Sequence, residues 1–416
     1  MAVYQIFPKK DATLYSEYPQ LNSGLDEILE LTKTSTSDPA RILISFDQQQ
    51  LQDVINNKIN PTITSGSWSA YLRLFASEAE SLPTDLTLLI DPIGQSWDQG
   101  TGRLANSPAT ENGACWLTRT NPDAVLFWAT SSGVTMSFSS SEGGGSWYTG
   151  STTTQSISEY TNKDIWNNVT SQTIRHYSGS ISNYGYIIRV TSSIENDLNY
   201  EYKLSYFSRD TNTIYPPSLV FYWNDQVWNI TSSADRIVTN QEFAVTLGNN
   251  KGIFQSNERI QMRVYARDTF PARSFVTSSL YAYNKLLPYN SWYQIVDVDT
   301  NDIIIPFDSR GTRISADDTS NYFNLDMDIL EPERFYTIQI RVYLNGNYYT
   351  TSNLLQFKVV QNSGPEGDTF SPLILPTPAS YVPPTPTPSG SYTGSYSGSL
   401  YVQNNFFEYC YISDTP

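Results

Sequence analysis

The only histidine of the chain, His176, is the first residue to consider for acid–base chemistry. Nucleophilic catalysis by a histidine needs a serine or cysteine beside it and a third group that orients the ring. No such nucleophile motif lies near His176, which follows a short predicted helix over residues 170–175. A zinc site built on histidines needs more than one of them. We therefore interpret His176 as a packing or surface residue.

Carboxylates are far more numerous than histidines, and pairs of them could hydrolyse glycosidic bonds. The chain has 41 Asp and Glu residues, so many pairs are possible, but no pattern in the sequence places two of them beside a cleft. The sequence therefore predicts a protein that is not an enzyme.

An acidic run could instead bind a cation. Asp297, Asp299 and Asn301 alternate along the chain, and oxygen ligands in alternation suit Ca²⁺. The run lacks the glycine and the distal glutamate of an EF-hand loop. Asp and Asn are also common turn residues. The sequence predicts a hairpin turn here, with a calcium site as the alternative, and indicates no other cofactor.

Tryptophans offer a third kind of chemistry, because a flat exposed ring can stack on the apolar face of a sugar. The candidates in the first half of the chain are Trp97, Trp116, Trp147 and Trp166. Large aromatic residues more often lie in the core. A sugar platform and a core role both stay open for them.

The composition predicts the structural class that must position these residues. The chain has 416 residues, of which 30 are Tyr and 9 are Trp, in a background of Ser, Thr and Asn. Aromatic side chains suit strands with one apolar and one wet face. We therefore expect an all-β protein.

Charge, cysteine content and hydropathy limit the classes of partner and the cellular location that we expect. A net charge of −16 argues against binding to nucleic acid or to an anionic membrane. Cys115 and Cys410 lie far apart, which argues against a disulfide framework. No signal-peptide pattern opens the chain and no run of eighteen apolar residues occurs. We expect synthesis in a cytoplasm without membrane insertion.

The first half of the chain predicts a series of strands. A hairpin spans residues 11–31, and Asp47 is a candidate N-cap for a helix over residues 48–58 with Leu51, Val54 and Ile55 on one face. Further strands are expected over residues 40–46, 69–75, 86–90, 183–190, 200–208 and 216–223. We assign residues 1–224 to a first β-sandwich.

A second pattern of alternating strands runs over residues 225–361. It predicts an immunoglobulin-like or fibronectin-like sandwich. Leu330, Pro332 and Tyr336 resemble a tyrosine corner, in which the phenol bonds back to the preceding backbone. Asn345 and Gly346 predict a type I′ hairpin turn. We expect this sandwich to be separable from the first near residue 224.

The composition changes sharply after Val360. Residues 362–416 are rich in Pro, Ser, Gly and Tyr, which predicts an extended arm without a core of its own. Its end carries an apolar cluster that includes Tyr401, Phe406, Phe407 and Tyr409. We expect this cluster to lie against a neighbouring subunit, with an unbound terminus as the alternative.

The order of the motifs in the first half resembles a known family. The segments are Ala12–Gly24, Arg41–Asp47, Tyr71–Phe75, Trp97–Gly102, Asn183–Arg189, Phe207–Asp210 and Pro216–Trp223. Together they look like the DNRLRE-type domain, a jelly-roll β-sandwich related to a family of carbohydrate-binding modules. Asp210 departs from the usual glutamate, and residues 48–66 lengthen the usual connection. The resemblance implies a jelly roll and at most a sugar-binding role.

Two longer runs resemble another group of proteins. DATLYSEYPQLNSGLDEILEL and IIIPFDSRGTRISADDTSNYFNLDMDILEPERFYTIQIRV look like segments of virion structural proteins of tailed marine phages, particularly those that infect cyanobacteria. The resemblance implies a subunit of the tail, baseplate, neck or fibre, located in the virion. Its partners would be other virion proteins, and it would act as a homo-oligomer or as a decoration on one. The rival hypothesis is an adhesin that binds host-surface glycans through the first sandwich.

Overall fold

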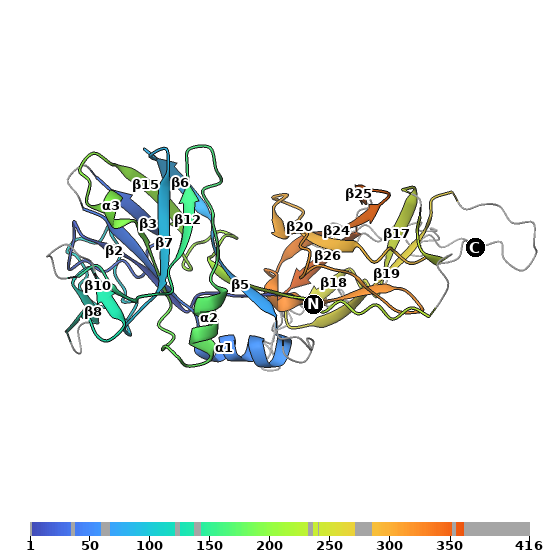
Figure 1. The fold of residues 1–416 in the computed structure, drawn as a ribbon, viewed down its shortest axis with the longest axis horizontal. Coiled ribbons are helices and arrows are strands. Elements are labelled where there is room, and N and C mark those ends of the chain that lie inside the picture. The colour runs from blue at the N-terminus through green and yellow to red at the C-terminus, as the bar shows by residue number, and fades with distance from the viewer. Residues whose placement is uncertain are drawn as a thin grey trace, which may run out of the picture. The chain divides into compact units, whose positions relative to one another are not determined.

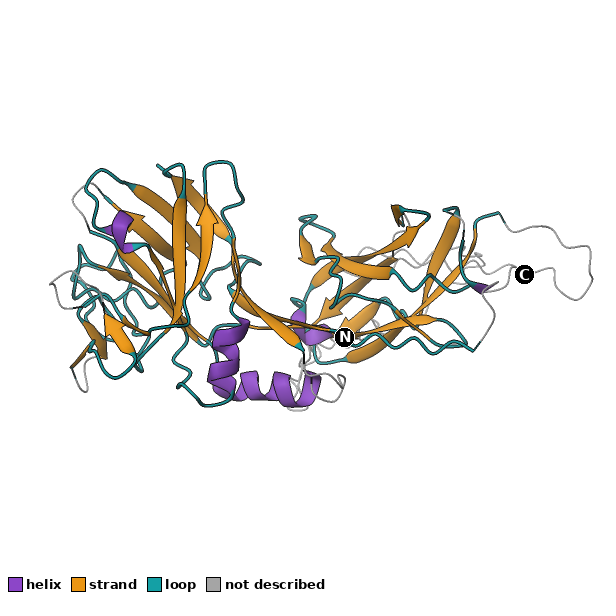
Figure 2. Ribbon diagram, in the orientation of Figure 1, coloured by secondary structure: helices purple, strands orange, loops and turns teal. Residues whose placement is uncertain are grey.

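Strands dominate the protein. The structure is a computed structural model, and it describes residues 2–34, 38–59, 67–120, 125–136, 143–231, 236–239, 241–270, 285–351 and 355–361. The chain divides into two compact units, Met1–Asn362 and Ser363–Pro416. In the first unit most regular segments are strands, with a few short helices between them (Figure 2). The predicted all-β class is confirmed.

Three sheets build the N-terminal sandwich, and all their strand pairs are antiparallel. The first sheet has the order β12-β7-β14-β4-β2, with bounds Thr153–Ile157, Leu86–Pro92, Tyr186–Val190, Ala40–Ser45 and Lys10–Tyr15. The second has the order β1-β16-β5-β13, with bounds Val3–Ile6, Ser218–Trp223, Trp68–Leu74 and Ile165–Asn168. The third has the order β3-β15-β6, with bounds Ile28–Lys33, Tyr202–Phe207 and Ala76–Glu80. The hairpin predicted over residues 11–31 is wrong, because β2 pairs with β4 in the first sheet and β3 pairs with β15 in the third.

Smaller elements complete this sandwich. Two short ribbons pair β8 with β9 and β10 with β11, with bounds Thr118–Thr120, Leu126–Phe127, Val134–Met136 and Ser146–Tyr148. The helices are α1 (Gln48–Asp53), which continues into the π-helix η1 (Val54–Ile59), then α2 (Thr170–Tyr177) and α3 (Ser192–Glu195). The predicted cap of α1 is confirmed, because the Asp47 carboxylate accepts from the backbone N–H of Gln49 at 2.7 Å.

Strand β4 shows why the first sandwich needs cover on both faces. Ile42 and Ile44 belong to the main hydrophobic core, whereas Leu43 points to a second cluster that contains Trp97, Trp116 and Trp147. Successive side chains of a strand point to opposite faces. A continuous apolar run therefore requires packing on either side.

Two sheets build the second sandwich. One has the order β17-β19-β23-β22, with bounds Phe243–Gly248, Arg259–Asp268, Asn321–Asp326 and Ser315–Ala316. The other has the order β18-β26-β24-β20-β21, with bounds Ile253–Gln255, Leu355–Val360, Arg334–Leu344, Ser291–Asp297 and Ile303–Ile305. Strand β25 (Asn347–Thr350) also pairs with β24, and the 3₁₀ turn η3 (Met327–Ile329) follows β23. Figure 1 shows β20, β24, β25 and β26 as neighbours.

Strand β16 contributes to both hydrophobic cores. Leu219 and Phe221 point into the N-terminal core, and Val220 and Tyr222 point into the core of the second sandwich, where Val3 of β1 joins them. The sheet that contains β1 and β16 is thus a wall shared by the two cores. The boundary near residue 224 stays a prediction, but the second core is completed by residues from the N-terminal side of that boundary.

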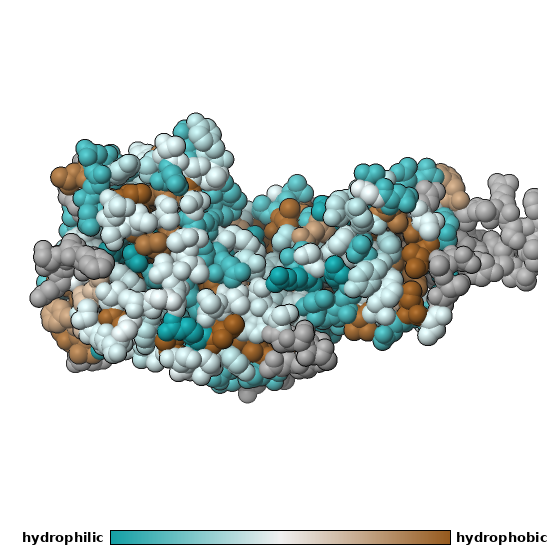
Figure 3. All heavy atoms as spheres, viewed as in Figure 1, coloured by the Kyte–Doolittle hydropathy of each residue, from teal (hydrophilic) through white to brown (hydrophobic). Residues whose placement is uncertain are grey.

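Hydrophobic residues are gathered in these cores. On the face of the molecule seen in Figure 3 they form only small groups among hydrophilic residues. In the part of the chain that the structure describes, no helix combines the length and the apolar character needed to cross a membrane.

Candidate functional site

The tryptophans proposed as a sugar platform lie in the interior. Trp97 is 1% exposed, and Trp116 and Trp147 are each 4% exposed. Their ring faces are covered by protein and cannot stack on a sugar. This burial agrees with the core role and contradicts the sugar platform for these three tryptophans. Trp166 is 38% exposed, but one of its faces stacks on Tyr71, with ring centroids 5.3 Å apart.

Two of these tryptophans instead enclose a buried cation. The guanidinium of Arg41 lies 5.0 Å from the Trp116 ring and 5.6 Å from the Trp147 ring. It also donates to both carboxylate oxygens of Glu195, at 2.6 and 3.1 Å. The arginine and the glutamate are about 2% and 3% exposed. Stacking and pairing together compensate for the loss of hydration of the two charges.

The glycine-rich loop before Trp147 completes this arrangement. Arg41 donates through Nη1 to the carbonyl of Gly144 at 2.7 Å. Gly144 has φ +80°, and a Cβ atom there would lie 2.6 Å from the same Nη1. Only glycine therefore fits between the backbone and the guanidinium. The sequence contained no signal for this pairing, because Arg41 and Glu195 are 154 residues apart.

The proposed calcium ligands form a turn and an ion pair. Asp297 is fully buried, and its carboxylate accepts from Arg334 at 2.5 and 2.9 Å. It also accepts from the backbone N–H groups of Asp299 and Thr300. Burial acts to raise the pKa of Asp297, but these hydrogen bonds, led by that from Arg334, outweigh it and leave the pKa below its usual value.

The oxygens of Asp297 are therefore already used within the protein. Asn301 has φ +62° and closes the hairpin between β20 and β21. In the described part of the chain, no three His, Cys, Asp or Glu side chains gather into a possible metal site. The hairpin prediction is confirmed. The calcium alternative stays a prediction, and the oxygens of Asp297 that it would need already accept hydrogen bonds within the protein.

His176 is a packing residue. It is 1% exposed on α2 and meets the Tyr186 ring edge-on, with centroids 5.4 Å apart. Burial lowers the pKa of His176 to about 4, so the ring is neutral at pH 7.

The residues predicted to be structural lie in strand β24 and the hairpin that follows it. Tyr336 is buried, and its hydroxyl donates to the carbonyl of Glu331 at 2.9 Å, which is the backbone bond that the tyrosine-corner pattern predicts. Asn345 and Gly346 have φ of 51° and 85° in the turn between β24 and β25. The arm residues Tyr401, Phe406, Phe407 and Tyr409 lie outside the described residues.

The junction of the two sandwiches contains a further group of polar contacts that the sequence did not predict. The Tyr4 hydroxyl donates to Asp328 at 2.6 Å, and the Gln5 amide donates to the carbonyl of Ile329 at 2.5 Å. Lys58 approaches Asp326 at 3.3 Å. Burial raises the pKa of Asp328, and the Tyr4 pKa is raised by burial and by the bond to that carboxylate. These contacts hold the first strand and the π-helix against the second sandwich.

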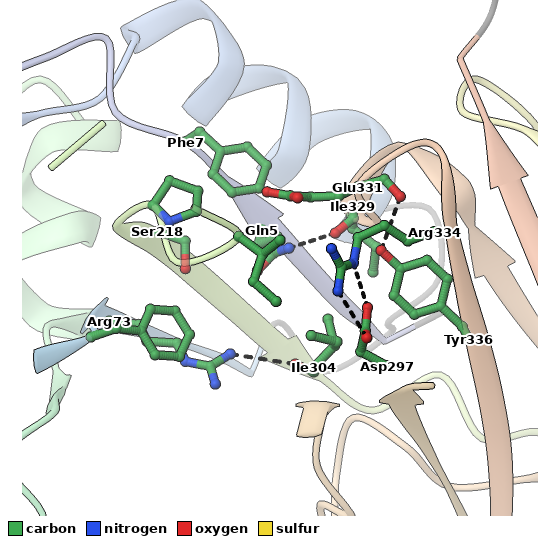
Figure 4. A pocket seen from close by; sticks show the side chains of 13 residues that line it. Gln5, Phe7, Arg73, Ser218, Asp297, Ile304, Ile329, Glu331, Arg334 and Tyr336 are labelled. Carbon is green, nitrogen blue, oxygen red and sulfur yellow. Dashed lines mark hydrogen bonds and ion pairs between the residues drawn. The ribbon is translucent and has the colours of Figure 1, made fainter. Parts of the chain in front are cut away.

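A small cavity lies within this junction, and Figure 4 shows its lining. Its volume of about 40 Å³ has room for only a few water molecules, whereas ordinary ligand pockets measure roughly 300–1,000 Å³. The guanidinium of Arg334 points to Asp297, and the Tyr336 hydroxyl points to Glu331 (Figure 4). These polar groups of the cavity lining therefore bond to other parts of the protein. The cavity is too small for a substrate.

Two larger hollows flank the segment Phe7–Pro8 at the junction, with volumes of about 590 and 650 Å³. Both also touch Asp328, which accepts from Tyr4. In the second hollow, Lys9 pairs with Asp47 at 2.7 Å, which is also the helix cap. Among the described residues that line the two hollows there is no histidine or cysteine, and the one serine is Ser256 in the first hollow.

No protein-family model matches the chain, and a search of curated proteins finds no match. Among solved structures, a DUF4785 family protein from Legionella pneumophila has 8% identity and a TM-score of 0.17, over 86% of this chain and 62% of that one. A β-glucuronidase from Parabacteroides merdae has 12% identity and a TM-score of 0.16, over 70% of this chain and 29% of that one. The adhesin domain of Epf from Streptococcus pyogenes has 7% identity and a TM-score of 0.16, over 87% of this chain and 92% of that one. The chain thus spans less than two thirds of the first two proteins, and similarity at this level carries no argument.

Proposed function

We propose that the protein is a structural subunit of a tailed-phage virion, in the tail, baseplate, neck or fibre, and that it has no enzymatic activity. It acts by packing against other virion proteins, as an oligomer or as a decoration on one. The resemblance of Asp11–Leu31 and Ile303–Val342 to segments of such proteins suggests this assignment. The observation that carries it is the wall shared by the two cores.

The shared wall supports a mechanical role because it joins the two sandwiches through buried apolar side chains. Val220 and Tyr222 pack in the second core, while their neighbours on the same strand pack in the first. A hinge between two independent domains would need few such contacts. A subunit that transmits or resists force in an assembly benefits from a junction of this kind.

The contacts made by three candidate reactive groups support a protein without catalytic activity. His176 is neutral and packed, Asp297 is paired with Arg334, and Glu195 is paired with Arg41. These three groups are thus used within the fold. Catalytic groups need instead to face a substrate-sized cavity.

Finer features of the architecture belong to the same proposal. We take the N-terminal sandwich to be a jelly roll of the DNRLRE type and the second to be immunoglobulin-like or fibronectin-like. The Tyr336 bond to Glu331 supports the second assignment. Residues 362–416 would extend along a neighbouring subunit. The rival adhesin hypothesis needs exposed tryptophans in the N-terminal sandwich, but Trp97, Trp116 and Trp147 are buried.

Mass spectrometry of particles purified from a culture that encodes this chain tests the proposal. The chain should appear in the particle fraction at an abundance comparable with the known structural subunits, and should resist removal by salt washing. Recovery only in the particle-free fraction would overturn the assignment. Deletion of residues 365–416 should abolish incorporation while the remaining residues stay folded, and normal incorporation would overturn the role of the arm.

A further inference from the structure

One face of the second sandwich carries exposed aromatic residues next to arginines. In strand β24, Ile340 and Val342 point inward, so Arg341 and Tyr343 point outward. Residues directly opposite each other in a sheet share a face. Trp292 of β20 lies opposite Arg341, and Tyr348 of β25 lies opposite Tyr343. The strands that carry them are neighbours in Figure 1.

This face continues beyond β20. Trp292 forms an isolated antiparallel bridge with Arg313, so an arginine lies on each side of the tryptophan in one row across the sheet. We call Arg341, Trp292 and Arg313 the arginine–tryptophan row. The next row consists of Tyr343 and Tyr348.

The aromatic rings of the two rows touch, and the two tyrosines are exposed to solvent. The Tyr348 ring lies 5.0 Å from the Tyr343 ring and 5.9 Å from the Trp292 ring, measured between centroids. Tyr348 is 63% exposed and Tyr343 is 38% exposed. Scattered exposed aromatics are ordinary, but a contiguous group marks an interaction surface.

The two arginines are held in place without a carboxylate. The Arg341 guanidinium lies 3.9 Å from the Phe307 ring and 5.8 Å from the Tyr348 ring. Arg313 donates to the carbonyl of Ser309 at 2.7 Å and to the Gln226 side chain at 3.0 Å. Among the described residues, neither guanidinium makes an ion pair. The two arginines therefore place two positive charges on this face, although the chain as a whole carries a net charge of −16.

We propose that this face binds an acidic glycan built from hexuronic acid. The apolar side of a pyranose ring would stack on the exposed Tyr348 ring, with Trp292 beside it at an angle of 52° to that ring, and the ring carboxylate would accept from Arg341. A hexuronic acid carries its carboxylate directly on the ring, and Arg341 adjoins both aromatic side chains. The flat, doubly donating guanidinium suits a carboxylate in this position.

Charge and size argue for this occupant over others. Nucleic acid needs many clustered cations, and the net charge of −16 opposes it. A neutral glycan would use the rings but leave both guanidiniums without a counter-ion. The proposal is independent of the virion assignment and of the tryptophans in the N-terminal sandwich.

Calorimetric titration of the full chain with trigalacturonic acid and with neutral galactotriose of the same linkage tests the proposal. The acidic trisaccharide should bind at least about tenfold more tightly, the factor expected for a hydrogen bond to a charged group. Arg341→Gln should remove this difference by weakening the acidic sugar alone. Tyr348→Ala should weaken both sugars. Tyr160→Ala, at a tyrosine that is 88% exposed in the N-terminal sandwich, is the matched control and should change neither.

Four results would overturn the proposal. Equal affinity for the two sugars would show that the arginines do not recognise the carboxylate. Absence of heat with the acidic sugar would show that this face does not bind it. Affinity that survives both Arg341→Gln and Tyr348→Ala would place the binding elsewhere. Circular dichroism of each variant must match that of the parent, and because the two substitutions act on different rows, misfolding of one leaves the other as the test. Self-association that Tyr348→Ala abolishes, without sugar binding, would assign the face to a second copy of the chain instead.

Discussion

The hydroxyl of Tyr4 donates to the carboxylate of Asp328 over 2.6 Å, across 324 residues of sequence. The bond ties β1, which begins the N-terminal sandwich, to the turn after β23 in the second sandwich. It lies beside the apolar contacts of Val3 and Tyr222 in the second core. The two sandwiches are thus connected by both polar and apolar contacts.

This connection predicts that residues 1–361 unfold as one unit. Tyr222→Ala removes a buried ring from the second core and should destabilise the protein by about 3–5 kcal/mol. Because the strand that carries it also closes the first core, both sandwiches should lose stability together. Urea unfolding should show a single transition by tryptophan fluorescence and by far-ultraviolet circular dichroism.

Exposed Tyr160 again provides a control, since Tyr160→Ala should shift the midpoint little. Two transitions, of which Tyr222→Ala moves only one, would contradict the prediction. Limited proteolysis gives a second measurement, and rapid cleavage near residue 224 into two stable fragments would support the separability expected from the sequence.

The buried pair of Arg41 and Glu195 should be costly to break. Arg41→Met leaves the Glu195 carboxylate buried without its partner, and we expect a loss of about 3–5 kcal/mol in unfolding free energy. Adding Glu195→Gln to Arg41→Met should recover part of this loss, because it removes the unpaired charge. The measurement is urea unfolding of the two variants at pH 7.

The exposed pair of Arg103 and Glu27 is the matched control. Their charged atoms are 3.9 Å apart, and the side chains are about half exposed. Arg103→Met should change stability by less than about 1 kcal/mol. Equal losses for Arg41→Met and Arg103→Met would show that burial does not set the strength of the inner pair.

The tyrosine corner makes a prediction for the second sandwich. Tyr336→Phe keeps the ring but removes the donor to Glu331, and should lower the unfolding free energy by about 1–2 kcal/mol. Tyr343→Phe, on the same strand but on the exposed face, should have a much smaller effect. Thermal unfolding of both variants decides the matter, and identical midpoints would remove the structural role of the Tyr336 hydroxyl.

Some elements of the fold could be predicted from the sequence, whereas contacts between distant residues could not. The alternation of β24 and the turn residues Asn345 and Gly346 predicted their elements, because side-chain period and φ > 0 are local properties. The roles of Trp116 and Trp147 were not predictable, because the cation between them and its partner Glu195 come from distant parts of the chain.

The shared wall did leave a signal in the sequence. Leu219–Trp223 is apolar at every position, and such a run indicates a strand covered on both faces. The run showed that a second layer was needed, but it could not show that the layer belonged to the following sandwich. The residues that meet in the arginine–tryptophan row are set by the register between neighbouring strands. The residues of one strand do not determine this register.

The last prediction concerns the dependence of stability on pH. Asp11 of β2 is fully buried, and its carboxylate accepts from the backbone N–H of Arg209 at 2.7 Å. Burial raises the pKa of Asp11 to about 7, above the value of about 3.9 expected in the unfolded chain. Between these values the folded state keeps a proton that the unfolded state releases. The contribution of Asp11 to stability is therefore full below pH 4 and is lost as the pH rises to about 7.

Asp11→Asn should remove this loss, because the amide is neutral at every pH and its oxygen can still accept from Arg209. The variant should gain stability relative to the parent as the pH rises from 4.5 to 7.5, by at most about 4 kcal/mol. His176 contributes in the opposite direction, since its pKa is lowered to about 4, but it is present in both proteins and cancels in the difference.

Asp47→Asn is the control for this experiment. The hydrogen bond from Lys9 leads the contributions that hold the pKa of Asp47 below its usual value, so its stabilisation is lost only as the pH falls below about 4. The difference between Asp47→Asn and the parent should stay constant from pH 4.5 to 7.5. Urea unfolding at several pH values in this range provides both differences. A pH-independent difference for Asp11→Asn would mean that Asp11 is ionised in the folded protein throughout the range.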